Sequence, residues 1–165
     1  MRMEKIDSIK GFLEVHSRLA ENDDSHIPTL VISAGTCGLA SGANLLIRAA
    51  KKELLQKKLT DKIRLRITGC HGLCAMEPSV LVEPRRTFYP KLRPGDMATI
   101  IEAAAKGTVV DSLLFIDPET GERIEKQDDL PFFRKQMRTI ISRNEKVDPI
   151  RIRDCVQTNV PATVF

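Results

Sequence analysis

Three cysteines in this chain have the residue type and the spacing of a metal–sulfur site. Cys70 and Cys74 have three residues between them in a glycine-bearing loop, and 32 residues separate Cys70 from Cys37, which lies between Gly35 and Gly38. Cysteine thiolates are the ligands of iron–sulfur clusters and of many zinc sites. Neighbouring glycines let the backbone turn tightly and direct N–H groups at sulfur. The pattern therefore predicts Cys37, Cys70 and Cys74 as metal ligands and favours an iron–sulfur site.

A [2Fe–2S] cluster takes four protein ligands, and the sequence offers no fourth cysteine at a comparable spacing. Cys155 is the remaining thiol, far along the chain. Other side chains with a suitable donor lie near the first or second cysteine loop: Asp24, His26, Ser33, Ser41 and His71. The sequence leaves the fourth ligand open among these.

Two other interpretations of the cysteines remain open. Structural zinc accepts three cysteines and a histidine, so Cys37, Cys70, Cys74 and a histidine could hold it. The three cysteines could also line a glycine-rich turn without any metal. Thiol–disulfide catalysis is disfavoured, because it uses a Cys-x-x-Cys pair at a helix start and the sequence contains none.

Composition narrows the class of protein. The 165 residues can form one ordinary domain with an extension. The net charge of +4 is spread along the chain and aromatic residues make up 4%, which disfavours nucleic-acid binding. No apolar stretch approaches the roughly 20 residues of a membrane span, and the start lacks the apolar core of a signal peptide. Four unevenly placed cysteines do not resemble a secreted disulfide framework, so we predict a cytoplasmic protein.

Hydrophobic patterning predicts how the cysteines are positioned. Apolar residues at helical spacing predict a helix over residues 3–20, and an aliphatic run predicts a buried strand over 28–33. Helical spacing returns over 41–58, and alternating charged and aliphatic residues predict a strand over 62–68. Two parallel strands joined by a crossover helix bring both cysteine loops to the same edge of a sheet.

The second half of the chain is predicted in the same way. A hairpin over 79–89 turns near Pro84-Arg85, and a helix opens at 94–96 and ends at Gly107. A turn-rich stretch over 113–124 predicts an exposed arm, and residues 130–144 form a basic amphipathic pattern that predicts a helix. We therefore divide the chain into an N-terminal helix and linker (1–27), an α/β domain (28–110) and a C-terminal part (111–165).

The domain from Pro28 to Gly107, with its loop 68–74 and the pair Cys70 and Cys74, resembles the thioredoxin-like [2Fe–2S] ferredoxin family. Members carry a cysteine pair with three residues between them in the second loop. In the first loop they commonly carry a pair with four residues between them. The resemblance implies a thioredoxin-like α/β fold, a central mixed sheet flanked by helices. It places Cys70 and Cys74 on the second pair and Cys37 in the first loop, where a serine and a glycine occupy the four-residue register.

A second resemblance concerns the C-terminal part. It is carried by Asp129 to Gln136, Arg138 to Ile140, Arg143-Asn144 and Asp148-Pro149. These residues resemble the segment that opens the flavoprotein module of NADH-binding subunits of complex I and of related soluble hydrogenases and formate dehydrogenases. Several of those subunits carry a thioredoxin-like ferredoxin domain ahead of this segment. The glycine-dense FMN and NADH loop that follows in that family is not found here, which implies a truncated or split subunit that binds neither FMN nor NADH.

Together these features predict an electron-transfer module of an NADH-dependent oxidoreductase that carries single electrons through a [2Fe–2S] cluster. The implied partners are a flavoprotein and other iron–sulfur subunits, which the basic segment 130–144 would contact. The chain would hold no complete catalytic site of its own. A cluster-free thioredoxin-fold adaptor and a zinc-stabilised interaction module are the alternatives.

Overall fold

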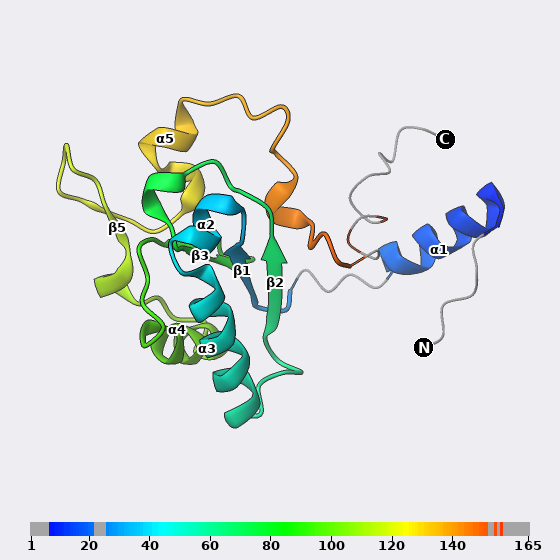
Figure 1. Ribbon diagram of the computed structural model, residues 1–165, viewed down its shortest axis with the longest axis horizontal. Helices are drawn as coiled ribbons and strands as arrows, with labels where there is room; N and C mark the ends of the chain where they lie inside the picture. Colours follow the sequence, from blue (N-terminus) through cyan, green and yellow to red (C-terminus); the bar gives the residue numbers. More distant parts are fainter. Residues whose placement is uncertain (1–6, 22–25, 152–153, 155, 157–165) are drawn as a thin grey trace.

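The structure is a computed structural model that describes residues 7–21, 26–151, 154 and 156 (Figure 1). Its central sheet has the strand order β2-β1-β3-β4. The strands are β1 (Thr29–Ser33), β2 (Arg64–Thr68), β3 (Val80–Glu83) and β4 (Thr87–Tyr89). β1 and β2 are parallel, whereas β3 is antiparallel to both β1 and β4. The sheet is therefore mixed, and the strands and hairpin predicted from the sequence are confirmed.

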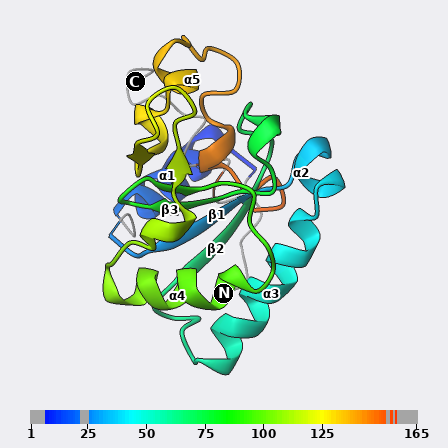
Figure 2. The same ribbon diagram turned by 90° about the vertical axis from the view of Figure 1, so that its left-hand side faces the viewer.

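Two helices cover one face of the sheet (Figure 2). They are α3 (Ala43–Gln56) and α4 (Asp96–Lys106), and α4 ends at Gly107 as predicted. The apolar face of each helix meets the side chains that alternate strand positions direct to that side, such as Leu30 and Ile32. This larger core lies between the strands and the two helices.

The C-terminal part covers the other face of the sheet. Leu130 and Phe133 pack against Val31, Leu81 and Phe88 from the three strands β1, β3 and β4. The short elements that bring them there are β5 (Phe115–Ile116), β6 (Arg123–Ile124), η3 (Gln127–Asp129), α5 (Pro131–Arg134) and η4 (Asn144–Lys146). Figure 2 shows α5 on the side of the strands opposite α3 and α4.

The stretch over 113–124 contains the short hairpin of β5 and β6, and its residues 118–123 are exposed, as predicted. The chain after it runs along β4, with Lys126 in a β-bridge to Thr87 and the Glu125 carbonyl accepting from the Phe88 N–H at 2.8 Å. Two sequence predictions need correction. The helix predicted over 130–144 is wrong: only Pro131–Arg134 forms an α-helix there. A short helix that the sequence did not predict, α2 (Thr36–Ala40), carries Cys37.

The remaining elements lie outside the sheet. Helix α1 (Ile9–Glu21) confirms the predicted N-terminal helix and lies to one side of the sheet in Figure 1. The 3₁₀ turns η1 (Cys74–Met76) and η2 (Asp111–Leu113) join the larger elements. No helix among the described residues is long and apolar enough to cross a membrane.

Candidate metal centre

The two cysteine loops leave the sheet side by side. β1 and β2 are parallel and in register to their last residues, Ser33 and Thr68, and the Ala34 N–H donates to the Thr68 carbonyl at 2.9 Å. The loops then touch, since a Cβ placed on Gly35 would lie 2.9 Å from the Cys70 Cβ. Only glycine allows this close approach without displacing Cys70. The predicted meeting of the two loops at one edge of the sheet is confirmed.

Three thiols converge where the loops meet. Cys37 is exposed in α2, Cys70 is half-buried, and Cys74 is exposed at the start of η1. The Sγ atoms of Cys70 and Cys74 are 3.9 Å apart. The hydrogen bonds of the Cys74 thiol with Cys37 and then with Cys70 raise its pKa to about 11, because the Cys74 proton is held by the neighbouring sulfurs and these thiols oppose one another's ionisation. A cation would be needed to hold them all as thiolates.

The Cys70–Cys74 pair has the spacing of a bidentate thiolate ligand. In a tetrahedral thiolate site with metal–sulfur bonds of about 2.3 Å, two ligand sulfurs lie about 3.8 Å apart. The observed 3.9 Å matches that separation. The Gly72 N–H also donates to Cys70 Sγ at 3.2 Å, a bond of the kind that stabilises cluster sulfur ligands. The donor set and the loop geometry therefore fit an iron–sulfur group.

Among the described residues, the structure places the other candidate ligands at different distances along the chain from the cysteine loops. His26 precedes β1, so the length of the strand, about 16 Å for five residues, separates it from the loops. The Ser33 hydroxyl is buried at the end of β1, and Ser41 is exposed at the end of α2. Asp24 and Cys155 lie outside the described residues.

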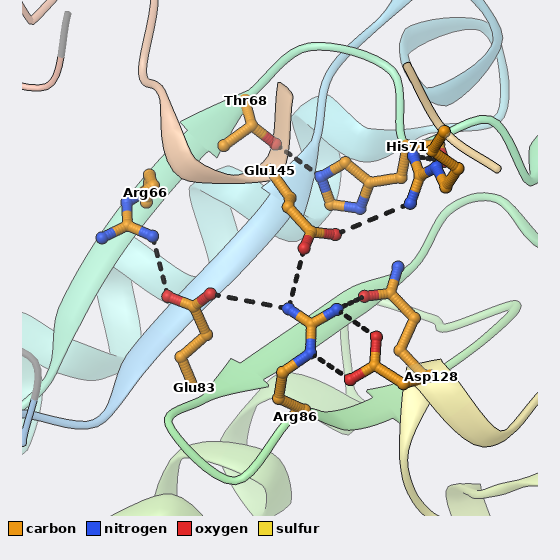
Figure 3. A network of polar contacts seen from close by, with 9 residues as sticks. Arg66, Thr68, His71, Glu83, Arg86, Asp128 and Glu145 are labelled. Atoms are coloured by element: carbon orange, nitrogen blue, oxygen red, sulfur yellow. Dashed lines mark hydrogen bonds and ion pairs between the residues drawn. The ribbon is translucent and has the colours of Figure 1, made fainter. Parts of the chain in front are cut away.

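His71 lies beneath the second loop. Its Nε2 is 2.7 Å from the Thr68 hydroxyl, and Figure 3 shows the ring directed toward Thr68 and Glu145. Burial lowers the pKa of His71 to about 4, so the ring is neutral at pH 7. In the part of the chain that the structure describes, no group of three or more His, Cys, Asp or Glu side chains is arranged to hold a metal ion.

Two residues that the sequence patterns did not single out as site residues contact the second loop. Asn144 Nδ2 donates to the Cys70 carbonyl at 3.0 Å, and Arg138 Nη2 donates to the His71 carbonyl. Both belong to the region predicted as a basic amphipathic helix that contacts a partner. The resemblance to the flavoprotein segment already pointed to these two residues, although it did not indicate this contact.

Comparison with known proteins places the fold. The chain is 29% identical over 69 residues to a [2Fe–2S] ferredoxin of Clostridium pasteurianum, a match that covers 41% of this chain and 68% of that protein. The structure superimposes on a thioredoxin-like [2Fe–2S] ferredoxin of Aquifex aeolicus with a TM-score of 0.50 and 19% identity, covering 59% of this chain and 98% of the other. The fold is thioredoxin-like. A comparison with protein-family profiles gives no match.

These findings confirm the predicted thioredoxin-like α/β fold, a central mixed sheet flanked by helices. The assignment of Cys37, Cys70 and Cys74 as ligands stays a prediction, and so do the domain boundaries at residues 27 and 110.

Proposed function

We propose that this chain is an electron carrier that binds a [2Fe–2S] cluster through Cys37, Cys70 and Cys74. The observation that carries the proposal is the convergence of these three thiols from two loops at one edge of a thioredoxin-like sheet. The 29% identity to a [2Fe–2S] ferredoxin supports the choice of an iron–sulfur cluster over zinc.

Such a cluster supplies one-electron chemistry, and the protein supplies ligands and surroundings. Cys70 and Cys74 are spaced to bind one iron, and Cys37 would supply a ligand to the other. The Gly72 N–H would donate to the Cys70 sulfur. The exposed positions of Cys37 and Cys74 would bring the site close to a partner's surface, as electron transfer requires.

We further propose that the chain acts within an NADH-dependent oxidoreductase of the complex I, hydrogenase or formate dehydrogenase type. Its partners would be a flavoprotein that binds FMN and NADH and other iron–sulfur subunits. The support is the sequence resemblance of residues 129–149 to the segment that opens the flavoprotein module. A pull-down of the chain with candidate flavoprotein subunits, followed by NADH-dependent reduction of the cluster, would test this context.

The cluster is tested by anaerobic purification, a visible spectrum, and counts of iron and acid-labile sulfide per chain. We expect about two irons and two sulfides, the content of one [2Fe–2S] cluster. A folded, colourless chain without iron would refute the proposal and favour a cluster-free adaptor. One zinc per chain would favour the zinc-stabilised module.

Serine variants test the ligands. Cys37→Ser, Cys70→Ser and Cys74→Ser should each lower the iron content and change the visible spectrum, because the serine hydroxyl is a poorer iron ligand than a thiolate. Cys155→Ser makes the same chemical change at the remaining thiol, and a loss of cluster in this variant would identify Cys155 as the fourth ligand. An unchanged spectrum and yield in Cys70→Ser or Cys74→Ser would contradict the assignment.

A further inference from the structure

The loop that carries Cys70 is held by side chains from more than 60 residues further along the chain. Two consecutive carbonyls of this loop, those of Cys70 and His71, accept hydrogen bonds from Asn144 and Arg138. A polar group in a loop usually bonds to water or to its own turn. Here the orientation of the two peptide groups is fixed by segment 138–145 instead.

The same segment packs against the glycine between the two cysteines. Gly72 has a φ of +90°, and a Cβ placed on it would lie 2.8 Å from Ile141 Cδ1. The Gly72 N–H is the donor to Cys70 Sγ. Ile141 therefore borders the peptide group that directs a hydrogen bond at the sulfur.

Segment 138–145 is itself anchored to the sheet. Glu145 is 5% exposed and accepts a hydrogen bond from Arg86 Nη1 at 2.8 Å, while its other carboxylate oxygen lies 3.9 Å from Arg138 Nη1 (Figure 3). The guanidinium carbon of Arg138 lies 4.9 Å from the centroid of the Phe133 ring. The contacts of Glu145 and Phe133 thus position the segment that carries Arg138 and Asn144, whose side-chain donors bond to the loop.

We propose that Asn144 and Arg138 are positioning residues of the cysteine site. They fix the backbone of Cys70 and His71, so that the Cys70 sulfur and the Gly72 N–H keep the geometry needed to bind the cluster. Arg138 also brings a positive charge to the loop, and a nearby cation favours the more negative, reduced state of a redox centre. This inference rests on the proposed function for its redox part, whereas its structural part holds for the metal-free protein.

The metal-free protein tests the structural part. Each cysteine is alkylated with iodoacetamide and the rates are followed by mass spectrometry, with Cys37 in the other loop as the internal reference. Asn144→Ala should raise the rate of Cys70 relative to Cys37 roughly fivefold, the factor expected for losing one hydrogen bond. Asn144→Asp should act alike, because a carboxylate cannot donate to the carbonyl. Lys146→Ala, an exposed change in the same 3₁₀ turn, should leave the ratio unchanged.

The loaded protein tests the redox part. Arg138→Met should lower the midpoint potential relative to wild type. Arg138→Lys keeps the positive charge, so its midpoint potential should stay close to that of wild type. Far-UV circular dichroism shows whether each variant is folded. Unfolding would also raise the alkylation rates of Cys37 and Cys70 together, whereas a local effect raises that of Cys70 alone. Equal Cys70-to-Cys37 ratios in wild type, Asn144→Ala and Arg138→Met would overturn the inference. A wild-type chain without iron would instead refute the proposed function, and the alkylation ratios would still decide the structural part.

Discussion

Replacement of Arg86 by methionine should destabilise the protein more than replacement of any other residue in the polar network around Arg86. Arg86 Nε and Nη2 donate to the Asp128 carboxylate at 2.6 and 2.8 Å, Nη2 also donates to the Gln127 side-chain oxygen at 2.9 Å, and Nη1 donates to Glu145 at 2.8 Å. Burial alone disfavours its charge, but the Asp128 and Glu145 carboxylates outweigh burial and raise the pKa of Arg86. These contacts join the β3–β4 turn to the C-terminal part (Figure 3).

The magnitude follows from the exposure of each partner. The Glu145 side chain is 7% exposed, so removing Arg86 leaves a buried carboxylate without its main partner, which costs about 3–5 kcal/mol for a fully buried pair. Arg86 is 24% exposed, which lowers this figure, and Asp128 at 62% exposure adds little. We expect Arg86→Met to lower the free energy of unfolding by about 3 kcal/mol. Methionine keeps the length of the stem and meets the same positive φ of 63° as arginine.

The assay is urea unfolding of the metal-free protein, followed by far-UV circular dichroism. Arg85→Met is the matched control in the same turn, because the Arg85 side chain is 53% exposed and its partner Glu125 is 29% exposed, so solvent screens this pair more than the pair of Arg86 with Glu145. It should have little effect. In a double-mutant cycle, Glu145→Gln should cost less in the Arg86→Met background than in wild type, since the buried carboxylate is then already unpaired. A loss below about 1 kcal/mol for Arg86→Met would refute the reasoning.

Three further predictions concern packing, the loop and pH. Leu130→Ala should lower the free energy of unfolding by about 3 kcal/mol in urea titrations, because Leu130 is 1% exposed and packs the C-terminal part against the sheet. Gly72→Ala should cost about 1–3 kcal/mol and lower the iron content, since alanine is strained at a φ of +90° and meets Ile141; equal stability and iron content would contradict the packing described. Burial raises the pKa of Glu77 from 4.5, so the folded state holds its proton more tightly than the unfolded state. Stability should therefore fall as pH rises from 4.5 through the folded pKa, and Glu77→Gln should remove that part of the pH dependence and be the more stable protein at neutral pH; parallel pH profiles of thermal unfolding would contradict this.

The meeting of the two cysteine loops was predictable, because it depends on strands and a helix that the sequence pattern indicates. The aliphatic run before Ser33 and the alternation before Thr68 predict two strands, and the helix between them requires a parallel pair. The meeting of the cysteine loops follows from this topology alone. Helix α2 was not predictable, because a segment with glycine on both sides of Thr36 and Cys37 is typical of a loop.

The C-terminal part was mispredicted for a physical reason. Apolar residues at 130, 133, 137, 140 and 141 have the spacing of one helical face, yet Met137 and Ile140 are 94% and 92% exposed. Hydrogen bonds from Arg138 and Asn144 to the cysteine loop and the contacts of Glu145 with Arg86 and Arg138 take the place of helical hydrogen bonds. The cysteine loop and Arg86 lie more than 50 residues away in the sequence, so local periodicity contains no signal of these contacts.

The path of residues 125–127 along β4 has a consequence for self-association. A strand at the edge of a sheet offers unpaired N–H and C=O groups to any other strand, including the same strand of a second molecule. In this chain the Phe88 N–H and the Arg86 carbonyl already bond to Glu125 and Gln127. Leu130 and Phe133 likewise occupy the apolar face formed by Val31, Leu81 and Phe88. The C-terminal part therefore covers the β4 edge and the second face of the sheet, through which a bare sheet of this kind could pair with its own copies.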